Sequence, residues 1–475
     1  MFTRRTHPNS GVFTFSINPV SVSLVLLWVM IFVLCLVTGE LSVTPRISGT
    51  PIATGPVSYE EILRSPGIDW LTYAGDYKAT RHSPLKQINA GNVEWLVPSW
   101  VYHIEGSSNL RATPLVRNGN MYVSTPNEVY ALEASTGQRL WLWRNPKFPK
   151  EGLNRGVALL GDKVFLVTSD CHLVALDRLT GEQVWETKYA EPKAGYYATL
   201  APLALKDRIV VGVSSGPCDC GRVSGRAFVA AFSAAEGREL WRFWAVPAKG
   251  EPGAETWGGG INLESVGGAA TWINGTFDPA LNLLYWPTGN PRPSYEGNVR
   301  PGDNLYSDSM LALDPDSGKL KWHFQFYPHD THDWDSTEYP ALIDMFWGDR
   351  TRKLMIQANR NGFFYVLDRT NGRFLLGKPF IKRLTWASGL DKNGRPIPNP
   401  GMEGYDLEKN TLCPWVRGAT NWMSPSYNPV TKLFYVVTLE QCGREKGDFY
   451  LKAIDPGSGD IRWEYPMPGP SNMTA

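Results

Sequence analysis

From residue 67 to the C-terminus, the chain is built of short runs in which apolar and polar residues alternate, and glycine, asparagine and aspartate separate the runs. This alternation places every second side chain on one face, as in half-buried β-strands joined by tight turns. Long stretches with the 3.6-residue period of an amphipathic helix are absent from the sequence. The pattern therefore predicts an all-β body.

A phrase of the form Ala-x-Asp-x-x-x-Gly-x-x-x-Trp recurs along this body. It is typical of a strand, a tight turn closed by aspartate and glycine, and a second strand that carries tryptophan to a fixed place. The six copies begin at Ala131, Ala175, Ala231, Ala312, Val366 and Ala453, of which the copy at Val366 is degenerate. Successive starts lie from 44 (131 to 175) to 87 (366 to 453) residues apart, which is compatible with four-stranded blades plus insertions. Because a solenoid would keep a tighter period, we expect a β-propeller with tryptophan-docking motifs.

The N-terminal part of the chain has a different character. Residues 21–37 form an uncharged apolar run preceded by Arg4 and Arg5, as in a signal peptide or an N-terminal membrane anchor. No small-x-small cleavage site follows the run cleanly, and this favours an uncleaved anchor. In either case the body is expected to be periplasmic, secreted or anchored to the periplasmic face of the inner membrane. The expected domains are a signal or anchor at 1–38, a linker at 39–66 and the propeller at 67–475.

The composition is that of a globular protein, with 43% hydrophobic and 20% charged residues, and the net charge of +1 gives no global attraction to nucleic acid. Export permits disulfides, and Cys413 and Cys442 flank a strand-turn-strand stretch, which predicts a disulfide between them. Cys218 and Cys220 lack a second close Cys/His pair, so a zinc site is not expected and their role stays open. No Cys-x-x-Cys-His motif for a covalent haem occurs in the chain.

The segment 328–335 places three carboxylates within six positions beside two histidines. If the segment is extended, Asp333 and Asp335 project from the same face, where a hard cation could lie between them. Like charges this close raise each other's pKa, whereas a bound multivalent ion lowers it, so the pair suits proton transfer or metal ligation. The alternative for such a segment is a solvated acidic turn.

The tryptophan phrase occurs together with the opening Asp-Trp-Leu-Thr-Tyr-Ala-Gly-Asp-Tyr at 69–77, Arg-His-Ser-Pro-Leu at 81–85 and Ile-Asn-Ala-Gly-Asn-Val at 88–93. In these features the chain, from about residue 67 to its end, resembles the pyrroloquinoline-quinone (PQQ) alcohol dehydrogenases, relatives of methanol dehydrogenase. The resemblance implies an eight-bladed propeller with the quinone and a metal ion on its axis. Only twelve residues follow Trp463, too few for further four-stranded blades, so the propeller is expected to be incomplete at the C-terminus.

The resemblance also implies a set of quinone-binding residues. Trp272, after a run of small residues, matches the stacking tryptophan, since small neighbours let an indole lie against a flat ligand. Arg155 matches the quinone-binding arginine, whose forked guanidinium suits a carboxylate. Thr199 and Ser214 occupy the hydroxyl positions of the family, and Asn421 is a further expected contact at the edge of the quinone.

By the same resemblance, Asn290 is an amide-oxygen ligand of the metal, Asp333 is the catalytic carboxylate and Asp335 is the extra aspartate of the lanthanide-using members. An additional carboxylate suits a larger and more highly charged ion, so a lanthanide is favoured over calcium. The implied reaction has Asp333 take the alcohol proton while the metal polarises the quinone C5 carbonyl and hydride passes to that carbonyl. Arg360 matches the cation near the reactive carbonyl, where it would hold Asp333 ionised.

Three positions depart from the family pattern. Pro217 stands where a glutamate is usual, and Asp219 is the carboxylate that would reach the metal instead. The adjacent cysteine pair that many relatives carry just before Asn154 is missing. Arg111 stands where many relatives have a glutamate that contacts the quinone.

The sequence thus predicts a PQQ-dependent dehydrogenase that oxidises an alcohol or related hydroxyl substrate and passes electrons to cytochrome c or another external acceptor. The alternative is a catalytically inactive propeller that serves as a binding scaffold, which would account for the missing glutamate. A scaffold, however, has no reason to keep the tryptophan, asparagine, arginine and paired aspartates together in one chain. These residues are Trp272, Asn290, Arg360, Asp333 and Asp335.

Overall fold

The structure is a computed structural model, and the residues that it describes belong to the unit Thr54–Ala475. It describes residues 55–106, 110–148, 152–215, 225–258, 267–402 and 412–468. The predicted N-terminal anchor and the Cys218 and Cys220 pair lie outside these ranges. Within them, no helix combines the length and the apolar character that a membrane crossing requires.

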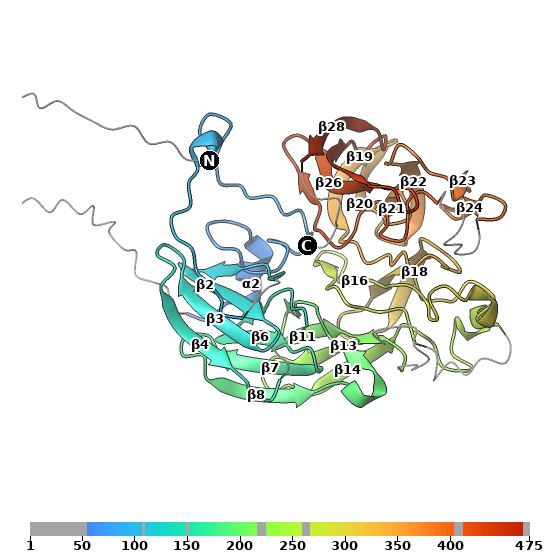
Figure 1. Cartoon of the computed structure of the whole chain (residues 1–475). Helices are drawn as coiled ribbons and strands as arrows, with labels where there is room; N and C mark the ends of the chain where they lie inside the picture. The colour runs from blue at the N-terminus through green and yellow to red at the C-terminus, as the bar shows by residue number, and fades with distance from the viewer. Residues whose placement is uncertain are drawn as a thin grey trace, which may run out of the picture. The chain divides into compact units, whose positions relative to one another are not determined.

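Six four-stranded antiparallel sheets, each made of strands in chain order, contain most of the described strands (Figure 1). The first three sheets are β1 (Leu115–Arg117), β2 (Asn120–Thr125), β3 (Glu128–Glu133), β4 (Arg139–Arg144); β5 (Ala158–Leu160), β6 (Lys163–Val167), β7 (His172–Asp177), β8 (Gln183–Lys188); and β10 (Leu203–Leu205), β11 (Arg208–Gly212), β13 (Phe228–Ser233), β14 (Glu239–Trp244). These are four-stranded blades of a β-propeller, as the alternating pattern predicts.

The remaining three blades continue the same order toward the C-terminus. They are β15 (Thr276–Asp278), β16 (Leu283–Pro287), β17 (Ser309–Leu313), β18 (Leu320–Gln325); β19 (Ala341–Trp347), β20 (Arg350–Ala358), β21 (Phe363–Asp368), β22 (Arg373–Pro379); and β25 (Ser426–Asn428), β26 (Leu433–Glu440), β27 (Asp448–Ile454), β28 (Ile461–Met467). Two small hairpins lie between blades, β9 (Tyr196–Tyr197) with β12 (Ser214–Ser215) and β23 (Ala387–Leu390) with β24 (Pro396–Pro398). Helical turns are short: α2 (Tyr59–Arg64), η1 (Val93–Trp95), η2 (Pro192–Ala194), η3 (Ala254–Trp257) and η4 (Gly297–Val299).

The repeated phrase forms the third and fourth strands of each blade. Its alanine faces its tryptophan across the strand pair, as Ala175 faces Trp185, and a bulge follows the alanine. The tryptophan lies on the turn of the next copy: the Trp141 indole covers Gly181, where an added Cβ would stand 2.6 Å from Cε3 of the ring. The Trp141 Nε1 donates to the Arg178 carbonyl of that turn at 3.1 Å. Glycine and tryptophan of the phrase therefore serve the contact between neighbouring blades.

The degenerate copy shows how the contact adapts when tryptophan is missing. Val366 in β21 faces Leu376 in β22, the position that tryptophan holds elsewhere. The Leu376 and Lys378 side chains then cover Gly459 of the following turn. Aliphatic atoms replace the indole and keep the turn covered, so the phrase tolerates the loss of its aromatic residue here.

The folded body begins before the boundary at residue 67 that the sequence suggests. Val57 is fully buried and its backbone pairs with Gly161. Helix α2 starts at a capping box of Ser58 and Glu61, and it buries Ile62. The last residues of the segment 39–66, which the sequence analysis expects to be a linker, therefore pack on the first two blades.

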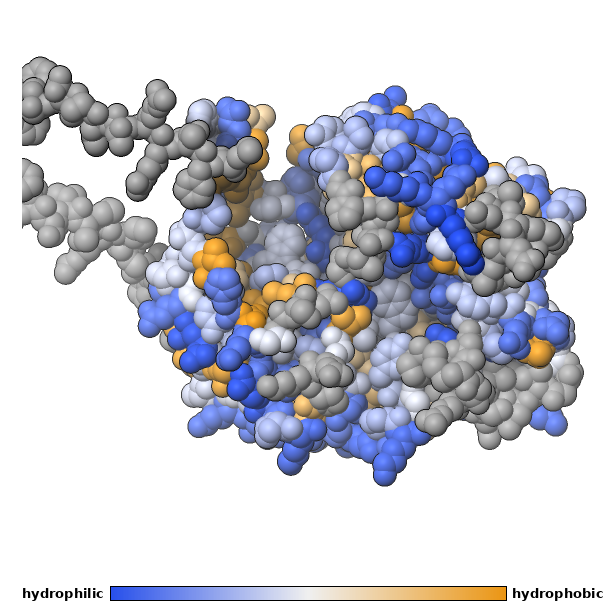
Figure 2. Space-filling view, viewed as in Figure 1, coloured by the Kyte–Doolittle hydropathy of each residue, from blue (hydrophilic) through white to orange (hydrophobic). Residues whose placement is uncertain are grey.

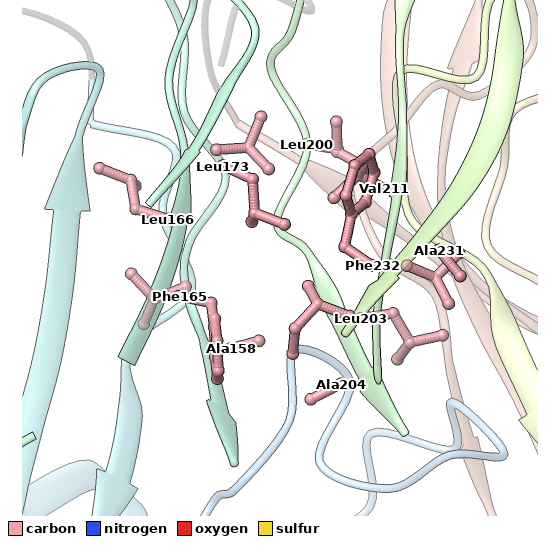
Figure 3. Close-up of a cluster of buried hydrophobic side chains, with 14 of the residues drawn as sticks. Ala158, Phe165, Leu166, Leu173, Leu200, Leu203, Ala204, Val211, Ala231 and Phe232 are labelled. Carbon is pink, nitrogen blue, oxygen red and sulfur yellow. The ribbon is translucent and has the colours of Figure 1, made fainter. Parts of the chain in front are cut away.

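Apolar side chains from adjacent blades meet between the sheets. Figure 3 shows such a cluster, with Phe165 and Leu166 of β6 on one side and Leu203 of β10 and Val211 of β11 on the other. The face shown in Figure 2 is largely hydrophilic, with apolar residues scattered among charged ones. The core thus consists of layers between blades rather than of one central cluster.

The predicted disulfide is confirmed: Cys413 and Cys442 are joined across 29 positions. It ties the loop before β25 to the end of β26. The Trp415 carbonyl in this loop accepts a hydrogen bond from Trp334 Nε1 at 3.0 Å. The disulfide therefore anchors a loop that touches the acidic segment.

Candidate active site

The candidate residues gather at one end of the strands because of the strand order. In a four-stranded antiparallel sheet, the loop between the second and third strands and the connection from the fourth strand to the next sheet leave from the same end. Asn290 and Arg360 follow the second strands β16 and β20. Arg155, Trp272 and the aspartates of segment 328–335 lie on connections that follow fourth strands. Loops at such an end are a common place for function.

The Asp335 carboxylate accepts three hydrogen bonds from three of the predicted site residues. The Asn290 backbone N–H donates to Oδ1 at 2.8 Å, and Trp272 Nε1 and Arg360 Nη1 donate to Oδ2 at 3.3 Å and 3.1 Å. Glycine at position 289 is required for this approach, since a Cβ there would stand 2.1 Å from Oδ1. The tertiary structure therefore brings Trp272, Asn290, Asp335 and Arg360 to one point.

Asp333 lies beside this group but not in the way that an extended segment would place it. Its φ of 61° is in the left-handed region, which aspartate tolerates better than most residues. The segment is therefore not extended at Asp333, although the same-face arrangement of Asp333 and Asp335 assumes an extended segment. Ser294 Oγ lies 3.5 Å from Asp333 Oδ1 and accepts a hydrogen bond from Asn290 Nδ2 at 2.8 Å. The two aspartates therefore approach Asn290 from opposite ends, one at its backbone and one at its amide.

Arg360 is held by its surroundings in the charged state. Burial lowers the pKa of Arg360, but the carboxylates of Asp335 and Asp333 outweigh this effect, so the pKa lies above its usual value. Nη1 forms an ion pair with Asp335, and Nη2 donates to the Val416 carbonyl at 3.0 Å. The direct partner of Arg360 is thus Asp335, and Asp333 acts on it through space.

Three more carboxyl groups, which the sequence analysis did not assign to the site, are buried around this cluster. Burial raises the pKa of Asp308 and of Glu338 well above the usual range, and Asp330 and Asp335 add to the effect on Asp308. Burial also raises the pKa of Asp330 to about 7, against the hydrogen bonds that it accepts from the backbone of His332 and Trp334. Three carboxyl groups whose charged forms are disfavoured by burial therefore lie near the Arg360–Asp335 ion pair.

A second group centres on Arg155. Its Nη1 donates to the Thr199 carbonyl at 3.1 Å and to Thr199 Oγ1 at 2.6 Å. The guanidinium carbon lies 4.6 Å from the ring centre of Trp272 and 5.1 Å from that of Trp422. Thr199 Oγ1 in turn lies 3.3 Å from the Trp272 carbonyl, to which it donates. Arg155, Thr199 and Trp272 are thus in contact with one another.

Ser214 and Asn421 occupy the margins of the site. Ser214 pairs with Tyr197 across the β9–β12 hairpin. Burial raises the pKa of Tyr197, the two aspartates Asp335 and Asp333 raise it further, and the Ser214 hydroxyl acts in the opposite direction. Asn421 accepts from the Trp422 backbone N–H at 2.8 Å and donates to the Arg417 carbonyl at 3.4 Å, so its side chain serves its own loop.

The arrangement suits a planar anion such as PQQ. Arg155 Nε and Arg360 Nε are buried and have no hydrogen-bond partner among the described residues, so two cationic donors stand ready near an indole face. Of the metal ligands that the resemblance implies, Asp333, Asp335 and Asn290 are among the described residues. Among the described residues, no group of three or more His, Cys, Asp or Glu side chains could hold an ion, and Asp219 lies outside them.

Besides these carboxyl groups, sequence reasoning missed three residues that complete the geometry. Ser294 links Asn290 to Asp333, and its only sequence signal is its position four residues after Asn290 in a turn-rich stretch. Trp422 follows Asn421 directly, and the indole rather than the amide reaches Arg155. Tyr197 lies two positions before Thr199.

Comparisons with known proteins identify a family for this chain. Residues 70–377 match the family described as glucose/ethanol/alcohol dehydrogenase, beta-propeller domain, of the PQQ type. The quinoprotein alcohol dehydrogenase PedH of Pseudomonas putida is 37% identical over 471 residues, which cover 87% of this chain and 78% of PedH. The quinohemoprotein alcohol dehydrogenase of Comamonas testosteroni is 38% identical, but this chain, matched over 85% of its length, spans only 57% of that relative.

Solved structures lead to the same family. The crystal structure of the Comamonas testosteroni quinohemoprotein alcohol dehydrogenase superposes with a TM-score of 0.80 at 32% identity, covering 88% of this chain and 70% of that one. A europium-containing methanol dehydrogenase superposes with a TM-score of 0.79 at 28% identity, covering 87% and 80%. Family match, sequence relatives and superposed structures therefore agree with one another. The chain belongs to the family of PQQ-dependent quinoprotein alcohol dehydrogenases.

Proposed function

We propose that this protein oxidises an alcohol or related hydroxyl substrate with bound PQQ and a hard metal ion, with Asp333 as the catalytic base. The observation that carries the proposal is the convergence of three donors, from Trp272, Asn290 and Arg360, on Asp335 beside Asp333. These residues come from four different loops, so their meeting point is a property of the fold. A binding scaffold would not need this arrangement.

The quinone would lie against the Trp272 indole, with its carboxylates toward the guanidinium of Arg155. Thr199 holds Arg155 through two hydrogen bonds, which fixes the direction of the remaining N–H groups. Ser214 and Asn421 are the proposed contacts at the edge of the ring system. When bound, the quinone supplies the two-electron acceptor for hydride, and the metal supplies the Lewis acid that polarises it.

In the proposed reaction, side chains of the protein itself accept the proton of the alcohol. Asp333 is partly exposed, and we propose that it takes the alcohol proton as hydride leaves the substrate carbon. Arg360, kept charged by its carboxylate neighbours, favours the ionised form of Asp333 before reaction. Asp335 holds Arg360 in place and adds the second negative charge near the metal.

The ligand set supports a lanthanide more than calcium. Asp333, Asp335 and the Asn290 oxygen are hard ligands, and two carboxylates suit an ion of higher charge. Asp219 is the proposed additional ligand. The europium that the methanol dehydrogenase relative contains is a property of that protein, and it supports this choice for the present chain only by similarity.

Electrons would then leave for a separate carrier, which we propose to be a cytochrome c or another external acceptor. No Cys-x-x-Cys-His occurs in the 475 residues, so this chain offers no covalent haem for the purpose. We also propose that the body works on the periplasmic side, with residues 21–37 as a signal or anchor, and that the ring contains eight blades with tryptophan docking between them.

The test is reconstitution of the purified chain with PQQ and either Ca²⁺ or La³⁺, followed by dye reduction with a panel of primary and secondary alcohols. We expect turnover with at least one alcohol, and faster turnover with La³⁺ than with Ca²⁺. The variant Asp333→Asn should bind PQQ like the wild type but lose turnover. If the wild type shows neither a bound quinone spectrum nor turnover with either ion, the scaffold function would stand instead.

A further inference from the structure

Arg111 and Arg155 both lie against the indole of Trp422. The Arg155 guanidinium carbon is 5.1 Å from the Trp422 ring centre, and that of Arg111 is 5.6 Å from the same ring. Trp422 and Trp272 pack on one buried cluster, so both indoles have fixed positions. Both guanidinium groups therefore make cation–π contacts with the Trp422 ring.

The backbone ties the two arginines together. The Thr113 backbone N–H donates to the Arg155 carbonyl at 2.9 Å, and Thr113 forms an isolated bridge with Gly156. Arg111 stands two residues before this bridge, on the segment that leads into β1. The relative placement of the two arginines is thus set by backbone hydrogen bonding rather than by flexible side chains alone.

The positive charge of Arg155 is buried and is not paired with a carboxylate of the described residues. It is only 3% exposed, and its hydrogen bonds go to neutral oxygens of Thr199. Among the described residues no carboxylate forms an ion pair with Arg155, and its Nε has no partner. Burial lowers the pKa of Arg155 to about 10, and the nearby charge of Arg111 adds to this effect. A buried cation beside a second cation is unfavourable unless an anion joins them.

We propose that Arg111 and Arg155 form an arginine pair that binds a carboxylate edge of the planar quinone, with Arg111 as a second cationic contact. The inference rests on the proposed function, since it assigns a further residue to the PQQ site. Forked guanidiniums match carboxylates, and the indoles of Trp272 and Trp422 supply the flat surface on which an aromatic anion packs. A neutral planar molecule could stack on the two indoles, but it would form no ion pair with either arginine.

The experiment measures PQQ binding without turnover. The purified full chain, free of quinone and in buffer with Ca²⁺ or La³⁺, is titrated with PQQ while quenching of tryptophan fluorescence or the heat of binding is followed. Removing one charge-assisted contact with Arg111→Ala should weaken binding about 10- to 100-fold. Arg111→Lys should lose less PQQ affinity than Arg111→Ala, because lysine keeps the positive charge but not the bidentate geometry of the guanidinium group. Arg111→Glu should lose more affinity than Arg111→Ala.

Two controls separate a direct contact from a structural role. Arg238→Ala removes an exposed arginine at the turn before β14 and should bind PQQ like the wild type. A PQQ ester with its carboxylates masked should bind equally to the wild type and to Arg111→Ala. The dependence of the dissociation constant on salt should also be shallower in Arg111→Ala, since one charge contact is gone.

The outcomes distinguish the two proposals. If the wild type binds PQQ and Arg111→Ala and Arg111→Glu bind it equally well, the arginine pair is wrong while the dehydrogenase function stands. If Arg111→Ala weakens the masked ester as much as PQQ, the residue is structural and the pair is also wrong. If the wild type binds no PQQ with either ion, the proposed function and the pair fail together.

Discussion

The Trp272 indole and the Asp335 carboxylate are joined directly, with Nε1 of the ring 3.3 Å from Oδ2 of the acid. One of these residues is the expected platform for the quinone and the other an expected metal ligand. The hydrogen bond makes them one unit, and Arg360 extends it through its ion pair with the same oxygen. A change in any of the three therefore acts on both halves of the site.

Loss of Asp335 should destabilise the fold. Asp335→Ala leaves the Arg360 guanidinium, whose side chain is 8% exposed, without its ion-pair partner. Breaking a buried pair in this way lowers the free energy of unfolding by about 3–5 kcal/mol. Urea denaturation of the metal-free protein measures the change. Asp349→Ala removes the 83% exposed partner of Arg352 and should stay within about 0.5 kcal/mol of the wild type.

Asp333 should matter for turnover rather than for cofactor binding. Asp333→Asn keeps the size of the side chain but removes the base, so kcat should fall about 10²- to 10⁴-fold. Dye reduction under saturating alcohol measures kcat, and fluorescence titration measures PQQ affinity in the same preparation. An equal loss of PQQ affinity and kcat would contradict the role of Asp333 as the base.

Trp272 should contribute to PQQ affinity through its ring. Trp272→Ala removes the aromatic platform together with the hydrogen bond to Asp335, and PQQ should bind about 10- to 100-fold more weakly. Trp272→Phe should recover part of the loss, because it restores the ring but not the N–H donor. Trp95→Ala is the matched control, since Trp95 is 74% exposed. A wild-type affinity in Trp272→Ala would exclude the stacking role.

The disulfide should stabilise the last described blade and the loop that contacts Trp334. The Cys413–Cys442 bond closes 29 positions, and by chain entropy its removal should lower the free energy of unfolding by about 3–4 kcal/mol. Thermal unfolding of the Cys413→Ala/Cys442→Ala double variant measures this. A reducing agent should lower the Tm of the wild type and leave that of the double variant unchanged.

His332 should make the protein acid-sensitive. It is fully buried, its Nδ1 pairs with the Tyr327 hydroxyl at 2.7 Å, and burial lowers its pKa to about 3. As pH falls below the unfolded-state value of about 6.5, the unfolded chain takes up the proton first. Stability that is present above pH 6.5 is therefore lost toward pH 3, by about 3–5 kcal/mol.

The comparison with a variant isolates this effect, because Asp330 acts in the opposite direction. The pKa of Asp330 is raised to about 7, so its contribution is full below the unfolded-state value and is lost as pH rises toward 7. His332→Asn keeps an acceptor for Tyr327 but does not titrate, and its stability should fall less than that of the wild type between pH 6.5 and 4. His103→Asn, at an exposed position, should follow the wild type. Parallel curves for the wild type and His332→Asn would rule the mechanism out.

Much of the architecture follows from local sequence. Alternating residues and the turn chemistry of Asp and Gly predict the hairpins, and the repeated alanine and tryptophan predict the contact between blades. The same reasoning does not show that Val57 and Ile62 are buried, since their burial depends on residues more than fifty positions away. The degenerate copy at Val366 likewise needs its neighbours to show that Leu376 replaces the indole.

The candidate site, too, can be predicted from the sequence only in part. The candidate residues Trp272, Asn290, Asp333 and Arg360 could be proposed from the sequence, because they stand at positions that match the motifs of the family. Their partners are not: which carboxylate binds Arg360, and that Ser294 connects to Asp333, are decided by loops brought to one end of separate sheets.

Residue type, hydrophobic period and turn chemistry depend only on neighbours along the chain. By themselves they determine that this protein forms repeated four-stranded sheets, with acidic residues and arginines in the segments between the sheets. Whether Arg111 and Arg155 meet at Trp422 depends on the packing of segments from distant blades. That packing is cooperative, because each contact holds only when all the intervening strands are in register, and so only the tertiary structure decided it.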